Sequence, residues 1–177
     1  MSNILESTYT ILRPLRLEDA CHIARLLGPD PEAVRMTAQI PEPCTEESAR
    51  EWIREGLPVE EDYVFAIELR GDHDFIGCIG FGGPHEALEV GYWVGKPYRD
   101  TGYASEALRI MLGHARTLGR TRLFAETFSG NIASIRVLMK NGFRLISTDM
   151  RDFPVRGERK KVERYVVELG DGDGQHR

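Results

Sequence analysis

The stretch that decides the fold is Tyr92-Trp93-Val94-Gly95-Lys96-Pro97-Tyr98-Arg99-Asp100-Thr101-Gly102-Tyr103-Ala104. It indicates an apolar strand, then a loop with glycine and proline, and then the start of a helix. The helix is predicted from apolar residues at helical spacing, with Gly119 just past its end: Ala104, Ala107, Leu108, Met111, Leu112, Ala115 and Leu118. The first amides of a helix lack intrahelical partners and lie at the positive end of its dipole. The segment therefore predicts an anion site, most often for a phosphate.

Two common phosphate-binding motifs are excluded by the letters of this segment and its surroundings. A P-loop requires Gly-Lys followed by Ser or Thr at the helix start, whereas Gly102 is followed by Tyr103. A dinucleotide fingerprint requires G-x-G-x-x-G, and the nearest candidate, Gly80-Phe81-Gly82, has His85 at the position of the third glycine. The anion must therefore be bound by a different kind of loop.

A second segment, from Asn131 to Phe143, also has a clear physical pattern. Asn131 is a favourable N-cap, and Gly142 suits the left-handed position after a helix. The residues between them place Ile132, Ile135, Leu138 and Met139 on an apolar stripe. Arg136 and Lys140 are four residues apart and share another face. The segment predicts a second amphipathic helix, which follows the first after one strand.

Both segments resemble motifs of the GNAT superfamily of N-acetyltransferases. Arg99-x-x-Gly102-x-Ala104 resembles the loop that binds the pyrophosphate of acetyl-CoA, and Asn131-x-x-Ser134 followed by Lys140-x-Gly142-Phe143 is similar to the later family motif. The resemblance covers residues 8–170 and implies an α/β, GNAT-like acyl-CoA N-acyltransferase fold, with a mixed central sheet flanked by helices. Leu12-Arg13-Pro14-Leu15 and Gly91-Tyr92-Trp93 resemble the branch that contains ribosomal-protein N-terminal acetyltransferases. That branch is also similar to many acetyltransferases of small amines.

The resemblance implies where acetyl-CoA, as co-substrate, would bind. It would enter between the strand ending at Val94 and the strand ending near Phe128, with the backbone of Trp93 and Val94 holding the pantetheine arm. The pyrophosphate would be wrapped by Arg99, Asp100, Thr101, Gly102, Tyr103 and Ala104, with further contacts from Asn131, Ser134, Arg136 and Lys140. Asp100 departs from the family's frequent Gly or Arg, and we expect its carboxylate to face solvent because it would repel phosphate. The side chain of Arg99 either contacts phosphate or is a solvated loop charge.

The reaction that the resemblance implies requires a group that removes a proton from an amine and a group that protonates the leaving thiolate. A carboxylate can serve as the base, often through water. Glu126 matches a position where some relatives carry their base, and Glu89 is the second candidate; the alternative is a surface carboxylate paired with a neighbour such as Arg122. Some relatives carry a tyrosine for the thiolate at the position of Leu138, which cannot donate a proton, so Ser134 is the candidate acid or else a plain helix residue.

The rest of the chain predicts one α/β domain over residues 8–170 and a polar, disordered tail over 171–177. Expected strands are 9–13, 64–69, 75–81, 88–94, 123–128 and 162–169, and the second and third of these form a hairpin across Gly71-Asp72. Helices are expected over 17–27 and from Thr45 through Ile53, the latter with a capping-box-like start. Residues 29–43 and 149–161 are expected to be loops that help to choose the acceptor.

Composition favours a cytoplasmic globular protein over several other classes. Of 177 residues, 41% are hydrophobic, and the net charge of −5 argues against a nucleic-acid binder. Three cysteines without C-x-x-C spacing indicate neither a disulfide framework nor a metal site, and no signal peptide or membrane span is expected. The expected partner is an amine acceptor, either a protein N-terminus or a small molecule such as a polyamine or amino sugar, with a homodimer left open. The alternatives are an acyl-CoA sensor without turnover and an unrelated α/β binding domain.

Overall fold

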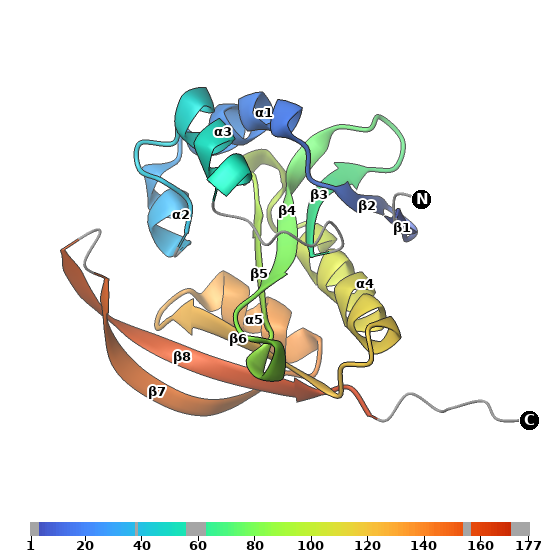
Figure 1. The fold of residues 1–177 in the computed structure, drawn as a ribbon, viewed down its shortest axis with the longest axis vertical. Helices are drawn as coiled ribbons and strands as arrows, with labels where there is room; N and C mark the ends of the chain where they lie inside the picture. Colours follow the sequence, from blue (N-terminus) through green and yellow to red (C-terminus); the bar gives the residue numbers. More distant parts are fainter. Residues whose placement is uncertain (1–3, 38, 56–62, 154–156, 171–177) are drawn as a thin grey trace, which may run out of the picture. The chain divides into compact units, whose positions relative to one another are not determined.

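The computed structural model describes residues 4–37, 39–55, 63–153 and 157–170, which fall into two compact units (Figure 1). The first unit comprises Met1–Phe81 and Tyr92–Ile110, and the second comprises Gly82–Gly91 and Met111–Arg177. Strand β5 (Glu89–Val94) and helix α4 (Tyr103–Thr117) both run from one unit into the other. The single domain over residues 8–170 stays a prediction, and the predicted tail lies outside the described residues.

The sheet of the first unit is antiparallel along β1 to β4, and the last residues of β5 follow β4. Its strands are β1 (Leu5–Glu6), β2 (Thr10–Pro14), β3 (Val64–Leu69) and β4 (Phe75–Gly82). The predicted hairpin is confirmed, with Phe65 opposite Ile79 and Ala66 opposite Cys78. All four of these side chains are buried, as expected for a strand pair at the centre of a sheet.

The helices of the first unit are η1 (Leu17–Asp19), α1 (Ala20–Leu27), α2 (Pro31–Met36), α3 (Glu46–Glu55) and η3 (Lys96–Tyr98). Helices α1 and α3 lie side by side (Figure 1). The predicted start of α3 is confirmed: Ser48 N donates to Thr45 Oγ1 at 3.1 Å, and Thr45 N donates to Ser48 Oγ at 2.9 Å. Two orphan amides are thereby satisfied reciprocally, as in a capping box.

Helix α2 corrects the prediction that residues 29–43 form an irregular loop. Asp30 caps the helix, because its Oδ1 accepts a hydrogen bond from Ala33 N at 3.1 Å, and Pro31 occupies the first turn. Proline is favoured there, since its missing N–H would have no partner in any case. The Asp30-Pro31 pair is therefore a helix start signal. It was not recognised because prolines are frequent in this segment.

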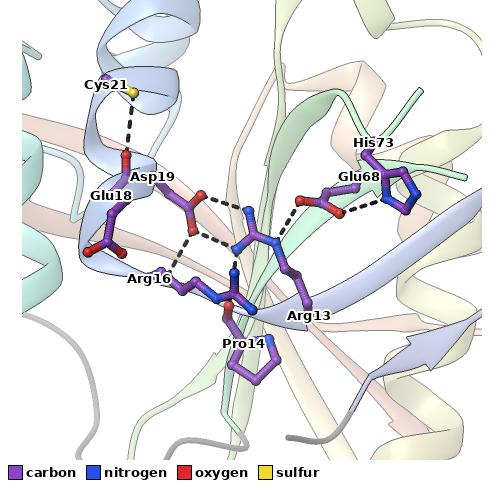
Figure 2. Close-up of polar contacts among 8 residues, drawn as sticks. All are labelled: Arg13, Pro14, Arg16, Glu18, Asp19, Cys21, Glu68 and His73. Carbon is purple, nitrogen blue, oxygen red and sulfur yellow. Dashed lines mark hydrogen bonds and ion pairs between the residues drawn. The ribbon is translucent and has the colours of Figure 1, made fainter.

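A buried ion cluster fixes the start of α1 to two strands of the first unit (Figure 2). The Arg13 guanidinium donates to both carboxylate oxygens of Asp19, at 2.7 and 2.8 Å, and its Nε donates to Glu68 Oε1 at 2.6 Å. Asp19 also accepts from Arg16 N at 2.8 Å. The hydrogen bond with Asp19, then that with Glu68, raises the pKa of Arg13 against the opposing effect of burial. One cation, Arg13 of β2, thus links this strand to β3 and to the η1–α1 segment.

The second unit is built on the strand order β5-β6-β8-β7. Its strands are β6 (Arg122–Phe128), β7 (Arg144–Phe153) and β8 (Glu158–Glu168), and its helices are η2 (His85–Ala87) and α5 (Ile132–Lys140). The start of β5 is parallel to β6, with Glu89 opposite Phe124, whereas β8 is antiparallel to both β6 and β7. The strands of the described residues thus form a mixed sheet flanked by helices, which confirms the predicted α/β class.

Strands β7 and β8 correct the prediction that residues 149–161 form a loop. Nearly every side chain of β7 is exposed, so its sequence, RLISTDMRDF, lacks the alternation of a half-buried strand. Pairing along the length of β8 nevertheless holds it in the sheet, from Arg144 opposite Val166 to Phe153 opposite Glu158. Strand β8 itself begins at Glu158, four residues before the predicted start at Val162.

Candidate functional site

The first part of the candidate site is the segment Arg99–Ala104, called the anion loop below, which leads from η3 into α4. The first helical hydrogen bond joins Glu106 N to Gly102 O at 3.0 Å, so the amides of Gly102, Tyr103 and Ala104 precede it. Asp100, Thr101 and Gly102 are exposed, which leaves these amides beside open solvent. The loop therefore has the donor groups and the access that an anion needs.

Two residues of the anion loop adopt left-handed backbone conformations. Asp100 has φ of 59° and Gly102 has φ of 92°. A Cβ added at Gly102 would meet no atom within 4 Å, so the space beside this residue is open. Glycine is thus required by the backbone conformation, and its missing side chain keeps that space open. The exposure of Asp100 agrees with the prediction that its carboxylate faces solvent.

The side chain of Arg99 is engaged with protein groups. Its Nε donates to Val94 O at 3.0 Å, and its Nη2 donates to Asp30 Oδ2 at 2.7 Å. Asp30 lies 69 residues earlier in the chain, at the N-cap of α2. The guanidinium is therefore directed at the end of β5 and the start of α2, an arrangement that the sequence did not indicate.

The end of β5 presents its two predicted pantetheine-binding residues differently. The carbonyl of Trp93 lies so close to Gly77 of β4 that a Cβ at Gly77 would collide with it. Gly95 N donates to Ile76 O at 2.8 Å, so Trp93 and Gly95 both direct backbone groups toward β4. Because these groups alternate along a strand, those of Val94 point away from β4. The Trp93 ring packs against Phe75, with 6.0 Å between centroids.

The second unit carries the predicted residues of helix α5. Asn131 caps this helix, since its Oδ1 accepts from Ser134 N at 3.2 Å, which confirms the predicted N-cap. Arg136 and Lys140 are both exposed, and neither forms an ion pair with another described residue. Helix α5 thus carries two exposed cations, Arg136 in its middle and Lys140 at its end.

The turn before α5 is supported by a carboxylate that the sequence did not indicate. Glu163 accepts hydrogen bonds from Ser129 Oγ at 2.7 Å and from Tyr165 OH at 2.6 Å. These bonds, the one from Tyr165 first, lower the pKa of Glu163. Burial and the bond to Glu163 raise the pKa of Tyr165 to about 12. A pair of strand side chains on β8 therefore fixes the turn that precedes Asn131.

The two candidate bases, Glu89 and Glu126, form a charge cluster with Arg151 and Arg164 in the second unit. Arg151 donates from both Nη atoms to the two carboxylate oxygens of Glu126, with 2.8 Å between Nη2 and Oε1. Arg164 Nη2 lies 3.5 Å from Glu89 Oε1, and its guanidinium lies over the ring of Phe124, 4.6 Å from the centroid. Glu126 is thus tightly paired, and its partner is Arg151 of β7, whereas Arg122 was the example of a neighbour given for that alternative.

Glu89 has the more perturbed electrostatic environment of the two. Burial, and then the negative charge of Glu126, raise its pKa above the ordinary value, while Arg164 and Arg151 oppose the rise. A carboxylate with a raised pKa is a stronger base than an ordinary one, and such groups are frequent at functional sites. The raised pKa of Glu89, together with the pairing of Glu126 with Arg151, makes Glu89 the stronger candidate for a proton acceptor.

Membrane-spanning helices and metal clusters are both absent from the described part of the chain. No described helix has both the length and the apolar character that are needed to cross a membrane. Likewise, no group of three or more His, Cys, Asp or Glu side chains among the described residues is arranged to bind a metal ion.

Sequence comparisons connect the chain to known proteins. A family model described as an acetyltransferase (GNAT) domain matches residues 10–144. The chain is 34% identical over 84 residues to an uncharacterized N-acetyltransferase, YoaA, of Bacillus subtilis strain 168. That match covers 45% of this chain and 48% of the relative, so it spans about half the length of the curated relative.

Solved structures share the fold over nearly the whole chain. A GNAT-family acetyltransferase from Bacillus anthracis matches with a TM-score of 0.81 at 21% identity, covering 94% of this chain and 99% of that one. RimL, a ribosomal L7/L12 alpha-N-protein acetyltransferase, matches with a TM-score of 0.78 at 19% identity, covering 95% of each chain. At such identities the likeness establishes a common fold.

Proposed function

Because this chain belongs to the GNAT family of acetyltransferases, we propose that it transfers an acetyl group from acetyl-CoA to a primary amine. The observation that carries the proposal is the anion loop, in which the amides at the start of α4 lie beside an exposed glycine with φ of 92°. A diphosphate carries its negative charge on several oxygens, and a helix N-terminus with open access fits such a group. The amides of Gly102, Tyr103 and Ala104 would bind it.

The pantetheine arm would be held by the backbone of Val94 rather than that of Trp93. The polar groups of Val94 point away from β4, whereas the carbonyl of Trp93 faces Gly77. An arm that pairs with a strand needs backbone groups that face outward, as an added strand does. The carbonyl of Val94 keeps a second lone pair beside its bond from Arg99 Nε. Trp93 would contribute through its ring, which packs within the first unit.

The exposed cations of α5 would bind the phosphates at the nucleotide end of acetyl-CoA. Arg136 and Lys140 are four residues apart on one face of the helix. Asn131 would serve mainly as the cap that holds the start of α5, since its side-chain oxygen already accepts from Ser134 N. Ser134 remains the candidate for protonating the leaving thiolate.

Glu89 would act as the general base, with Glu126 as the residue that tunes it. Acetyl-CoA supplies the acetyl group as a thioester, and the attacking amine must first be neutral. The raised pKa of Glu89 brings this carboxylate closer to the pKa of an amine, which improves it as an acceptor of the proton. Glu126 is held by Arg151, so its negative charge is fixed beside Glu89 instead of being used for proton transfer.

The acceptor that fits best is a protein N-terminal α-amine. With an ordinary pKa of about 8, an α-amine loses its proton at pH 7 for about 1.4 kcal/mol, against about 4.6 kcal/mol for a lysine side chain. A carboxylate base is therefore better matched to the α-amine. The structural neighbour RimL is described as acting on an α-amine. A small amine remains the second candidate, and the cytoplasmic location and the homodimer stay predictions.

The proposal is tested by release of free thiol from acetyl-CoA in the presence of an amine panel. The panel contains tripeptides with a free α-amine, N-acetylated tripeptides with one lysine, spermidine and an aminoglycoside. We expect the fastest release with a free α-amine. Binding of acetyl-CoA without release in any arm would contradict catalysis and support a sensor.

A further inference from the structure

The contact between Arg99 and Asp30 joins two segments of the first unit that are far apart in sequence. The two carboxylate oxygens of Asp30 have different partners: Oδ1 accepts from Ala33 N at 3.1 Å and caps α2, while Oδ2 accepts from Arg99 Nη2 at 2.7 Å. The Asp30 side chain is 13% exposed and that of Arg99 is 38% exposed. The cap and the ion pair therefore hold one another in place.

The second contact of Arg99 ties the same guanidinium to the end of β5. Nε donates to Val94 O at 3.0 Å, five residues before Arg99 itself. Val94 is the residue whose backbone we assign to the pantetheine arm. One planar side chain thus joins the end of β5 to the N-cap of α2, in a geometry that a lysine, with a single nitrogen, could not reproduce.

These contacts also leave the Arg99 side chain less available to bind phosphate. Two of its donors are used by protein acceptors, and a carboxylate lies within hydrogen-bonding distance of the guanidinium. The negative charge of that carboxylate offsets the positive charge of the guanidinium, which would otherwise attract a phosphate. The amides of Gly102, Tyr103 and Ala104 precede the first helical hydrogen bond of α4, so we expect them to bind the anion without this side chain.

We propose that Arg99 is a positioning residue that holds α2 against the end of β5, and that its side chain does not bind the pyrophosphate. The inference rests on the proposed function and assigns a role to α2, which lies within the segment 29–43 that was expected to help choose the acceptor. Loss of the bridge would release the start of α2 and weaken use of the amine, while the amides of the anion loop would still bind acetyl-CoA.

The test uses variants that separate the bridge from the charge and the cap. Arg99→Gln removes the guanidinium, whereas Asp30→Asn keeps an oxygen for the cap and removes the ion pair, because asparagine is as good an N-cap as aspartate. The double variant Asp30→Asn/Arg99→Gln completes a cycle, and Arg99→Lys tests rescue by charge alone. Circular dichroism and thermal melts confirm that each variant is folded.

Three quantities are measured: the Kd of acetyl-CoA by calorimetry, amide hydrogen exchange of residues 32–36, and the KM of the panel amine that is used fastest. We expect both single variants to leave the Kd within about twofold, to speed exchange of α2 by about tenfold and to raise the amine KM by about tenfold, as for a lost charge-assisted hydrogen bond. The double variant should change the exchange of α2 and the amine KM no more than either single variant does. Arg99→Lys should restore little of the wild-type values.

A phosphate role would give a different pattern. If Arg99→Gln weakens acetyl-CoA by tenfold or more while Asp30→Asn does not, or if neither variant changes the exchange of α2, the inference is overturned. A wild-type protein that fails to bind acetyl-CoA would instead overturn the proposed function. In that case the amide hydrogen exchange of residues 32–36 still decides whether Arg99 positions α2.

Discussion

Glu126 and Arg151 form a two-pronged ion pair across the sheet of the second unit, from β6 to β7, two strands that are separated by β8. The pair occupies both carboxylate oxygens of Glu126. Burial, and then the negative charge of Glu126, raise the pKa of Glu89, so the two candidate bases are electrostatically linked.

This relationship predicts different kinetic effects for two similar substitutions, Glu89→Gln and Glu126→Gln. Glu89→Gln removes the base and should lower kcat by about 100-fold or more, with the acetyl-CoA Kd unchanged. Glu126→Gln keeps the base but removes the negative charge that raises the pKa of Glu89, so the acid limb of kcat/KM should move to lower pH. Both are measured from pH–rate profiles. A larger loss of kcat for Glu126→Gln than for Glu89→Gln would restore Glu126 as the base.

The Arg13 cluster should be a major source of stability in the first unit. The Arg13 side chain is 13% exposed, so Arg13→Met would leave the carboxylates of Asp19 and Glu68 without their cation. Breaking a buried pair on one side costs about 3 kcal/mol or more. Urea unfolding measures the loss, and Arg70→Met, at a pair with about half-exposed side chains, is the matched control with a loss of about 1 kcal/mol or less. Equal losses of unfolding free energy in Arg13→Met and Arg70→Met would show that the Arg13 cluster contributes no more than an exposed ion pair.

Tyr165→Phe should destabilise the protein in a pH-dependent way. Near pH 7 it removes a hydrogen bond to the Glu163 carboxylate, which costs about 1.5 kcal/mol. The pKa of Glu163 is lowered, so its contribution is present above the ordinary carboxylate pKa and is lost as pH falls through the folded value. The raised pKa of Tyr165, about 12, makes its contribution fade as pH rises from about 10 to 12.

The stability of the wild-type protein and of Tyr165→Phe should therefore differ most near neutral pH and converge at both extremes. Chemical unfolding at pH 3, 7 and 11 measures the difference. A difference in unfolding free energy that is constant across this range would mean that the effect is packing alone.

Local sequence signals predicted the parts of the molecule that local physics determines. Gly102, the apolar spacing of α4 and the N-cap Asn131 each act within a few residues, and the structure agrees with the backbone that they imply. Strand β7 could not be found in this way, because its exposed side chains carry no alternation and its place depends on pairing with β8. Its partner is set by register, not by its own composition.

Two contacts that refine the candidate site are non-local. Arg99 meets Asp30 across 69 residues, and Arg151 meets Glu126 across 25. Sequence alone presented Arg99 as either a phosphate ligand or a loop charge, and presented Glu126 as the leading base. Only the strand and helix positions reveal which acceptors these side chains reach.

The anion loop is tested most directly by comparing Gly102→Val with Gly119→Val. Both glycines have left-handed φ, 92° and 72°, and a Cβ added to either meets no atom within 4 Å. Each variant should therefore lose a similar stability, on the order of 1–3 kcal/mol. In titration calorimetry with acetyl-CoA, we expect Gly119→Val to bind like the wild type and Gly102→Val to show no binding. Equal affinity in the two variants would contradict the assignment of the anion loop to the diphosphate.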